Sequence, residues 1–397
     1  MKWPQKKFSE LYAVPSRNGL NRPSRVRGEG YKMVNMGELF ANNWIGDIEM
    51  ERVNMNDREL EQCALAEGDL LFARQSLVLE GAGKCSLVTE VPEVTTFESH
   101  LIRVRLDKAK ANPLFYYYLF ASPYSGISTI VQQCAQAGIR GSQLAELPVL
   151  CPPPEIQRGI ADVLSAYDEV MENNRRRMEL LEESARLLYR EWFVRLRFPG
   201  HEHTRITNGL PEGWEKKSLG ELADVTMGQS PESKFYNESG EGLPFHQGVA
   251  DFGDRFVTNR IFTTALNRIA EAGDILCSVR APVGRLNLTL DKIVIGRGLA
   301  ALRSRTGNQS LLFYQLRSHF FKEDLIGAGA IFASVTKTEF QNQKLLMPIN
   351  RLVQAFEEIS HPVDKQLRVL HLQNQKLRAA RDLMLPRMMT GKIVVRK

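Results

Sequence analysis

The chain has few cysteines and no long apolar run. Its five cysteines are spread over 397 residues without a Cys-x-x-Cys pair, which argues against a disulfide framework and against a zinc site of the usual spacing. No apolar run approaches the roughly 18 residues that a membrane-spanning helix needs. The first residues, Met1-Lys2-Trp3-Pro4, lack the apolar stretch of a signal peptide. We therefore expect a cytoplasmic protein whose cysteines are small buried residues or idle thiols.

Motifs for catalysis are also missing. Residues 81–85 suggest a phosphate-binding loop, but the Walker pattern needs a glycine where Val78 stands and a serine or threonine where Cys85 stands. Residues 112–115 resemble the Asn-Pro-Pro-aromatic loop of amino methyltransferases without its second proline. His201-Glu202-His203 has no third metal ligand beside it. The sequence therefore predicts a protein with no catalytic residue, no metal site and no reaction of its own.

Charge and length are the first positive signals. The formal net charge is +6, a mild excess that favours a polyanionic partner over a membrane. A chain of 397 residues is long enough for two or three domains with full hydrophobic cores.

One uninterrupted helix is predicted between Pro152-Pro153-Pro154 and Pro199-Gly200, over residues 155–194. Steps of four and three residues select a row of mostly apolar positions, and a strict 3.5-residue repeat is typical of a coiled-coil seam that needs a partner helix. The seam positions are Ile160, Leu164, Tyr167, Met171, Asn174, Met178, Leu181, Ala185, Leu188 and Trp192.

The chain repeats itself, and the second copy supplies the partner helix. Adding 196 to each number gives a second seam at Phe356, Ser360, Val363, Leu367, Leu370, Asn374, Leu377, Arg381, Met384 and Met388. Asp168 matches Asp364 at the same offset, so we read the chain as a diverged tandem repeat of globular domain and long helix. If paired numbers sum to 548, the helices are antiparallel with Asn174 opposite Asn374, which satisfies both amides. Pro386 is expected to end or kink the second helix.

The predicted fold class is α+β, with two mixed α/β domains separated by two long helices that form an antiparallel coiled coil. The segments are a first domain at 1–150, a central helix and its exit at 151–200, a tether at 201–208, a second domain at 209–348, and a C-terminal helix and tail at 349–397. Within the first domain we predict strands at 70–73, 101–106 and 147–150, and helices at 113–120 and 124–133.

Polar loops in both domains carry side chains suited to reading DNA. Arginine, asparagine and glutamine have planar donor and acceptor groups that match base edges in the major groove, and arginine also neutralises phosphate. Residues 16–27 gather four arginines without one acid, although a merely solvated loop would look the same. The second-domain loops hold their arginines between glycine and proline, which favours fixed poses. The predicted DNA-binding residues are Arg17, Arg22, Arg25, Arg74, Gln75, Gln229, His246, Gln247, Arg280, Arg285 and Arg297.

Over its whole length the chain resembles the specificity (S) subunits of type I restriction and modification systems. Residues 152–168, Pro-Pro-Pro-Glu-Ile-Gln through Tyr-Asp, resemble the start of that family's central helix. Residues 242–248 and 279–284 resemble one of its target-recognition domain types. The second repeat departs from the pattern, because Ile349-Asn350-Arg351-Leu352 replaces the proline-rich segment and Ser360 and Arg381 interrupt the seam.

The resemblance implies a non-catalytic subunit for phage defence in a bacterial or archaeal cytoplasm. Two target-recognition domains, held apart by the helices, would each read one half of an interrupted site in double-stranded DNA. The helices would dock two methyltransferase (M) subunits, and motor-nuclease (R) subunits would join that core. The chain itself would hold no cofactor, since AdoMet, ATP and Mg would belong to the partner subunits of this DNA-methylating and ATP-dependent endonuclease complex.

Two other functions stay open from the residues alone. The chain could be an enzyme, either a self-contained methyltransferase or a nuclease with an unrecognised site. It could also be an adaptor in which the coiled coil joins two protein-binding domains without nucleic acid. The DNA sequence, the spacer length and the loop residues that touch bases rather than phosphates do not follow from the sequence.

Overall fold

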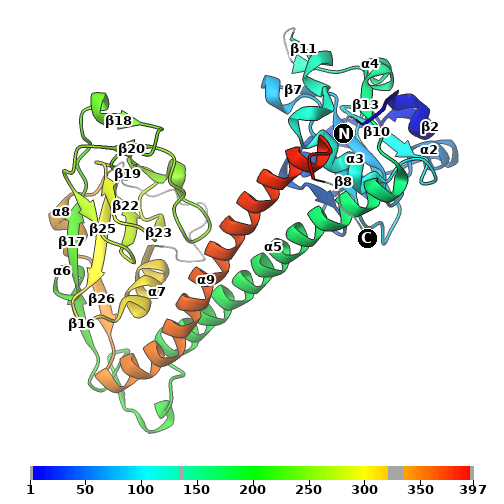
Figure 1. Ribbon diagram of the computed structural model, residues 1–397. Coiled ribbons are helices and arrows are strands. Elements are labelled where there is room, and N and C mark those ends of the chain that lie inside the picture. Colours follow the sequence, from blue (N-terminus) through cyan, green and yellow to red (C-terminus); the bar gives the residue numbers. More distant parts are fainter. Residues whose placement is uncertain (1–2, 134–136, 321–333, 394–397) are drawn as a thin grey trace. The chain divides into compact units, whose positions relative to one another are not determined.

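The computed structural model describes residues 3–133, 137–320 and 334–393 and divides into two compact units (Figure 1). Unit 1 is Met1–Asn173 with Gln373–Lys397, and unit 2 is Asn174–Leu372. Each unit combines sheets and short helices with one stretch of both long helices. Among these described residues, no helix is both long and apolar enough to cross a membrane.

A five-stranded sheet is the centre of unit 1. Its order is β2-β10-β6-β8-β4, and the central pairings β10–β2, β10–β6 and β6–β8 are antiparallel. All four residues of β6 are buried, as expected for a short apolar run with both faces covered. The bounds are β2 (Tyr12–Asn18), β10 (Leu101–Leu106), β6 (Leu70–Ala73), β8 (Cys85–Val88) and β4 (Trp44–Ile45).

Smaller elements complete the globular part of unit 1. A second sheet has the order β5-β3-β9, a third β11-β12-β7, and the pair β1–β13 is antiparallel. The helix α3 begins with Pro113 and is capped by Asn112, whose side chain accepts from the backbone N–H of Phe115 at 3.1 Å. The bounds are β1 (Gln5–Lys7), β3 (Arg27–Val34), α1 (Met36–Ala41), β5 (Glu51–Val53), α2 (Asp57–Cys63), β7 (Gln75–Ser76), β9 (Thr95–Phe97), α3 (Pro113–Phe120), β11 (Gln132–Gln133), β12 (Ala137–Gly138), α4 (Gly141–Glu146) and β13 (Pro148–Leu150).

Unit 2 repeats the central sheet of unit 1. Its four-stranded sheet has the order β17-β25-β22-β23, which corresponds strand for strand to β2-β10-β6-β8. The pair β16–β26 likewise corresponds to β1–β13. The bounds are β16 (Glu215–Ser218), α6 (Leu219–Leu222), β17 (Ala223–Met227), β22 (Ile275–Ser278), β23 (Leu286–Leu288), β25 (Leu299–Ser304), α7 (Gln309–Phe320), α8 (Lys337–Gln341) and β26 (Lys344–Met347).

A second sheet of unit 2 has the order β18-β20-β19-β24-β21. Its strands are β18 (Tyr236–Asn237), β19 (Leu243–His246), β20 (Phe262–Thr263), β21 (Ile269–Ala270) and β24 (Ile293–Ile295). The stretch predicted as a tether at 201–208 contains a 3-10 turn, His201–His203, and β14 (Ile206–Thr207), which pairs with β15 (Leu210–Pro211). The repeated sheet and the tandem likeness in sequence therefore describe the same duplication.

The two long helices are α5 (Pro154–Tyr189), which continues as a π-helical turn over Arg190–Val194, and α9 (Asn350–Met389). Every predicted seam position on both helices is buried or half-buried. The polar interruptions of the second seam have partners inside the fold. Ser360 donates to the carbonyl of Phe356 at 2.8 Å, and the guanidinium of Arg381 pairs with Asp168 at 2.5 Å.

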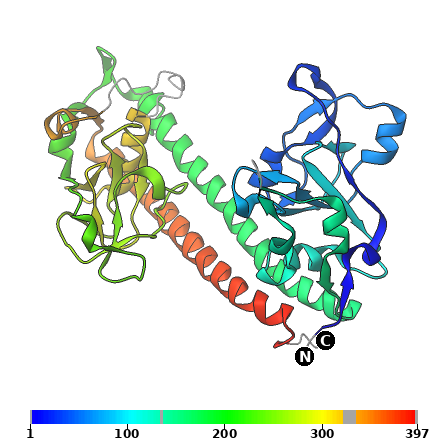
Figure 2. The same ribbon diagram turned by 90° about the horizontal axis from the view of Figure 1, so that it is seen from above.

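Within unit 1 the helices run side by side and antiparallel (Figures 1 and 2). The Asn374 amide donates to the Met171 carbonyl at 3.0 Å, and Arg381 pairs with Asp168. Numbers therefore rise along one helix as they fall along the other. The predicted antiparallel direction is confirmed within this unit, whereas the facing of Asn174 by Asn374 stays a prediction.

Within unit 2 the helices are antiparallel as well. Trp192 and Phe356 lie with ring centroids 6.2 Å apart, in the layer that a sum of 548 requires. Both rings belong to a core cluster that also holds residues of α7 and β22. The helices are thus built into the core of the globular part.

Two local predictions are wrong. Pro386 does not end α9, which continues to Met389, and it does not remove the last layer, since Met388 is 3% exposed and shares a core with Ile160. The alternative, a kink at Pro386, stays a prediction. Packing of the last turn outweighs the lost backbone donor, because a proline near a helix end costs only one bond. Residues 124–133 are not one helix but two 3-10 turns, Pro123–Ser125 and Ile127–Ile130, followed by β11. Gly126 at φ 71° separates those turns, and its left-handed backbone breaks an α-helix.

Candidate nucleic-acid interface

A buried aspartate fixes the start of the central strand in each unit. Gly68 and Gly273 take the left-handed backbone at φ 91° and 90°, which permits a tight turn. The next residue, Asp69 or Asp274, accepts a turn N–H at 2.8 Å in both units. Each carboxylate also accepts from an arginine Nε at 2.7 Å, Arg105 on β10 or Arg303 on β25. The same set of interactions thus holds one end of the central sheet in each unit.

The candidate reading residues lie at the opposite end of these strands. After β6, the Arg74 N–H donates to the His100 carbonyl at 2.8 Å and its carbonyl accepts from the Ile139 N–H at 2.9 Å. After β22, Val279 makes the corresponding bonds with Gly298 and Val335, both 2.9 Å. Arg74 therefore corresponds to Val279, and Gln75 to Arg280. Both loops were predicted to bind DNA, but their structural equivalence was not predicted.

A glycine in each unit brings a second loop close to this end. A Cβ on Gly19 would lie 2.0 Å from the Phe97 carbonyl oxygen, and one on Gly228 would lie 2.1 Å from that of Gly296. Only glycine fits these approaches, since any side chain would collide with backbone. The first loop of each unit is thereby held against the loop that follows β9 or β24.

In unit 2 the structure brings most of the predicted residues together. Gln229, Gln247, Arg280 and Arg297 are exposed on loops bound directly to one another. The Gln229 N–H donates to the Ile295 carbonyl at 3.0 Å, and the Gln247 carbonyl accepts from the Gly298 N–H at 3.1 Å. The Arg297 N–H donates to Ser230 Oγ at 3.2 Å. These four side chains form what we call the unit 2 reading face.

Arg285 lies on the same β22–β23 turn as Arg280. Ser278 Oγ accepts from the Arg285 N–H at 2.9 Å, and the Ser278 N–H donates to the Arg285 carbonyl at 2.9 Å. The turn is thus closed at its base, while the side chains of Arg280 and Arg285 are exposed. The fixed poses of the two guanidinium groups stay a prediction.

His246 does not belong to this face and is a correction. Its side chain is 0% exposed, with Nε2 2.9 Å from Asn259 Oδ1 and Nδ1 3.6 Å from Asp251 Oδ2. Burial lowers the pKa of His246 below its usual value, which favours the neutral ring. A fully buried imidazole cannot reach a base edge, so its role is to support the β19 loop that carries Gln247.

The unit 1 arginines are tied to the protein more than the sequence suggested. Arg22 makes a bidentate pair with Glu59 of α2 at 2.6 and 2.7 Å, and this hydrogen bonding lowers the pKa of Glu59. Arg17 is exposed, yet its guanidinium donates to Gln62 of the same helix at 2.5 Å. The loop itself lacks acids, but α2 supplies them. Arg22 is therefore better explained as a structural anchor than as a base contact.

Three further predicted residues of unit 1 are at least partly exposed. Arg25 is exposed and Arg74 and Gln75 are half-buried. Gln75 pairs with Gly138 on β12, and the exposed Arg140 follows two residues later. Arg140 was not among the predicted residues. It corresponds to Thr336 at the offset of 196, and the two stand at the N-cap positions of α4 and α8. Gln75, Arg74 and Arg140 form the unit 1 reading face.

The two rejected catalytic motifs have structural roles. Asn112 caps α3 with its side chain, and its backbone N–H donates to Gln157 Oε1 at 2.8 Å. The Lys84 amine donates to the Phe40 carbonyl at 2.6 Å, and burial lowers the pKa of Lys84. Neither arrangement leaves the polar group aimed at a substrate.

Comparison with known proteins places the chain in one family. The sequence matches the family described as "Type I restriction modification DNA specificity domain" over residues 12–183 and again over 211–377. It is 28% identical over 405 residues to the putative type I restriction enzyme MjaX specificity subunit of Methanocaldococcus jannaschii, covering 99% of this chain and 94% of that protein. It is also 28% identical over 163 residues to the EcoKI specificity subunit of Escherichia coli K12, covering 39% and 35% of the two chains.

The fold is similar to a crystal structure of the type I restriction-modification system S subunit from M. genitalium. The TM-score is 0.63 at 17% identity, over 98% of this chain and 96% of that one. At that identity the likeness concerns the fold alone. The double family match falls on the two structural repeats.

Proposed function

Because the chain belongs to the family of type I restriction-modification specificity subunits, we propose that each of its recognition domains reads one half of an interrupted DNA site. The observation that carries this proposal is the pair of equivalent reading faces. Each stands at the corresponding end of the repeated sheet in its own unit, yet the two faces present different side chains, Gln75 in unit 1 and Arg280 in unit 2. Two copies of one sheet that carry different polar side chains at the corresponding end suit two half-sites of different sequence.

The polar side chains of the reading faces are of types that can bind base edges. An arginine fork matches the O6 and N7 acceptors of guanine, and a glutamine amide matches the N6 and N7 groups of adenine. Arg280 and Arg297 are exposed on loops fixed by backbone bonds, so little loop freedom would be lost on binding. We expect these side chains to supply direct contacts in the second half-site.

We further propose that the long helices dock two methyltransferase subunits. Large apolar side chains remain exposed on their outer surfaces, and Leu180 and Leu187 of α5, 72% and 41% exposed, stand one heptad apart and therefore face the same side. Exposed apolar rows of this kind mark partner surfaces. The others are Ile359 and Val369 of α9 in unit 2, and Val170 and Leu383 in unit 1. Motor-nuclease subunits would join the same complex.

In this proposal the partners carry the catalysis. AdoMet, ATP and Mg would bind to the methyltransferase and motor-nuclease subunits, and this chain would choose the site. The net charge of +6 supplies few phosphate contacts for a specific complex of roughly 10 nM or tighter. We therefore expect the chain alone to bind DNA weakly, and its partners to add basic surface.

The test is reconstitution with and without the methyltransferase subunits. Methylated positions on genomic DNA, mapped after incubation with AdoMet, should define one interrupted motif in the presence of both proteins and none with this chain alone. Binding by the complex should weaken steeply as salt rises. Methyl transfer by the chain alone would show it to be an enzyme. Absence of salt-dependent DNA binding by the complex would favour an adaptor.

A further inference from the structure

A buried arginine joins the recognition domain of unit 2 to the long helices of the same unit. Arg255 is 5% exposed and lies on the loop between a 3-10 turn, Val249–Asp251, and β20. Arginines are seldom buried unless they are paired, since taking the charge out of water is costly. Its partners therefore show what this loop is built to hold.

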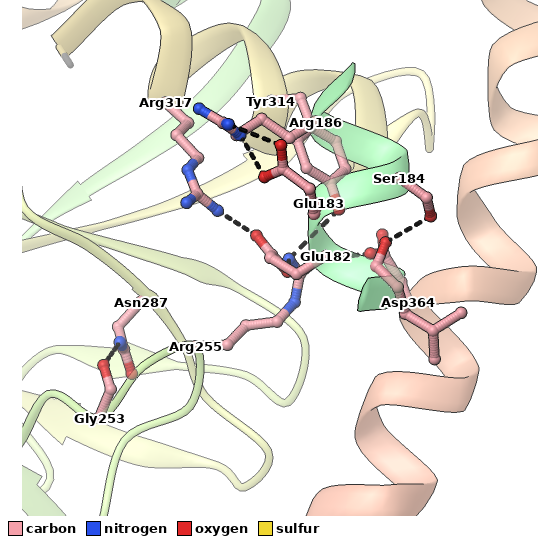
Figure 3. A network of polar contacts seen from close by, with 11 residues as sticks. Glu182, Glu183, Ser184, Arg186, Gly253, Arg255, Asn287, Tyr314, Arg317 and Asp364 are labelled. Carbon is pink, nitrogen blue, oxygen red and sulfur yellow. Dashed lines mark hydrogen bonds and ion pairs between the residues drawn. The ribbon is translucent and has the colours of Figure 1, made fainter. Parts of the chain in front are cut away.

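The Arg255 guanidinium contacts three helices at once (Figure 3). It pairs with Glu182 of α5 and, at 2.5 Å, with Asp364 of α9. It also donates to the Tyr314 hydroxyl of α7 at 3.3 Å. The flat side of the guanidinium lies 4.3 Å from the centroid of the Phe313 ring, a cation–π contact strengthened by burial.

Glu182 adds a second link to the domain. Its other carboxylate oxygen accepts from Arg317, which lies on α7 with Tyr314. A single acid of α5 is thus shared by two arginines of the globular part. The network ties one short stretch of α5 and one of α9 to the domain through directional bonds.

From Arg255 the connection continues toward the unit 2 reading face. The Arg255 carbonyl accepts from the Leu288 N–H at 2.8 Å, and the Val257 N–H donates to the Leu288 carbonyl at 3.1 Å. Leu288 ends β23, and β23 begins at Leu286, directly after the turn that carries Arg280 and Arg285. The reading turn is therefore attached to the helices through one strand and one arginine.

Unit 1 makes the equivalent junction differently. Tyr118 and Asp168 correspond to Tyr314 and Asp364, at the offset of 196, and the Tyr118 hydroxyl donates directly to Asp168 at 2.6 Å. The cation on Asp168 is Arg381, which belongs to α9 itself. In unit 2 the cation comes from the recognition domain, so there the ion pairs of Arg255 link the domain directly to both helices.

We propose that Arg255 is a positioning residue that fixes the tilt of the second recognition domain on the helices and thereby sets the spacer length between the two half-sites. This rests on the proposed function, because it presupposes bipartite reading. Successive base pairs stand about 3.4 Å apart, so a small rotation of the domain moves its reading face by one step along DNA. Arg255 does this without touching DNA.

The test uses the complete complex with methyltransferase subunits. DNA substrates carry the native half-sites with the native spacer, or with one or two base pairs added or removed, and methylation rates are compared. Arg255→Met keeps the length and the contact with Phe313 but loses every polar bond. We expect its preference for the native spacer to fall roughly tenfold, as misplacement of reacting parts by about 1 Å is costly. The bases required within each half-site should not change.

The preference of Arg255→Lys for the native spacer should fall between those of wild type and the Met variant, since an ammonium group lacks the planar arrangement of donors that binds two carboxylates in a fixed geometry. The matched control is Arg305→Met, which removes an exposed pair with Asp224 of 2.9 Å within the same domain, away from the helices. It should keep the native spacer preference. Equal broadening by the control would overturn the proposal.

A cavity of about 390 Å³ beside Arg255 supplies a second test. Its lining includes Phe256, Phe313 and Asp364. Arg255→Ala enlarges it, and ethylguanidinium at a non-denaturing concentration should restore the spacer preference if the guanidinium contacts are what matters. Failure of rescue together with an unchanged spacer preference in Arg255→Lys would overturn the proposal. Altered base choice in the second half-site alone would also overturn it, whereas a wild-type complex with no bipartite motif would instead refute the proposed function.

Discussion

The two units share a frame and differ in what is attached to it. Four strands follow in the same order, β2-β10-β6-β8 and β17-β25-β22-β23, and each central strand starts at an aspartate paired with an arginine, Asp69 with Arg105 and Asp274 with Arg303. Between β2 and β6, unit 1 carries β3, β4, β5 and the helices α1 and α2, whereas between β17 and β22, unit 2 carries the short strands β18, β19, β20 and β21. The two repeats keep the strands and the aspartate–arginine pair that fix the sheet, and they differ in the elements attached to it.

The largest effect is expected from removing the aspartate of the frame. Asp69→Ala should lower the free energy of unfolding of unit 1 by about 3 kcal/mol, because a buried pair and a turn bond are broken together. Asp274→Ala should cost less in unit 2, since its partner side chain Arg303 is 50% exposed and Arg105 is 33% exposed. Hydrogen exchange read by mass spectrometry, peptide by peptide, distinguishes the two units.

Glu10→Ala provides the matched control for that experiment. Its carboxylate accepts the exposed Lys7 N–H at 2.9 Å, so its effect should stay below about 1 kcal/mol. Equal destabilisation of both units by either aspartate variant would mean that the units do not unfold separately. The comparison of the frames would then have to be made on fragments.

The next effect concerns the equivalent reading residues. Arg280→Ala should relax base preference in one half-site by about 1 to 3 kcal/mol of discrimination, the value of one bidentate contact. Gln75→Ala, at the corresponding position of unit 1, should relax only the other half. Gln247→Ala should act on the same half as Arg280→Ala. Methylation motifs on genomic DNA measure this, and equal loss in both halves would indicate damage to folding or assembly.

Sequence reasoning succeeded where a pattern is local or periodic. The strands at 70–73 and 101–106, α3 and both long helices were predicted because short apolar runs and a 3.5-residue repeat are visible in the chain itself. The duplication was visible because Asp168 and Asp364 recur at one offset. These features need no knowledge of distant contacts.

The loop residues whose roles differ from the prediction depend on contacts that no local pattern reveals. Arg22 forms an ion pair with Glu59 of α2, which the sequence of its own loop does not reveal. His246 is buried with its ring nitrogens beside Asn259 and Asp251. Arg255 drew no attention, since its acids lie on α5 and α9, up to 109 residues away. A polar residue in a loop looks the same in sequence whether it faces water or fills a buried junction.

His246 gives a pH dependence that should belong to unit 2 alone. Burial depresses its pKa in the folded state, so the unfolded chain takes up a proton first as the pH falls below about 6.5. The resulting stability is present above that pH and is lost on acidification, by at most about 1.4 kcal/mol per pH unit. His246→Asn should flatten the pH dependence of thermal unfolding of unit 2 between pH 5 and 7. An unchanged slope would show that other groups set it.

The smallest effect is expected at the helix pairing of unit 1. Asn374 donates to the Met171 carbonyl at 3.0 Å, and a hydrogen bond of this kind contributes about 1 kcal/mol net, which leucine largely offsets by burying apolar surface. Asn374→Leu should therefore change the free energy of unfolding by less than about 1 kcal/mol, but it should relax the register, because a polar seam position penalises slipped alignments. Cross-linking in a background without native cysteines measures that relaxation.

The native register is reported by cross-linking of Tyr167→Cys with Met384→Cys, because the Tyr167 Oη lies 3.9 Å from the Met384 Sδ. A slip of one heptad is reported by Tyr167→Cys with Leu377→Cys, which should cross-link only in the Asn374→Leu background. The exposed Asn173 of α5 is the matched control, and Asn173→Leu should leave the slipped pair unlinked. If neither leucine variant yields the slipped product, the register is fixed by the core around Ile160 and Leu164 rather than by the asparagine.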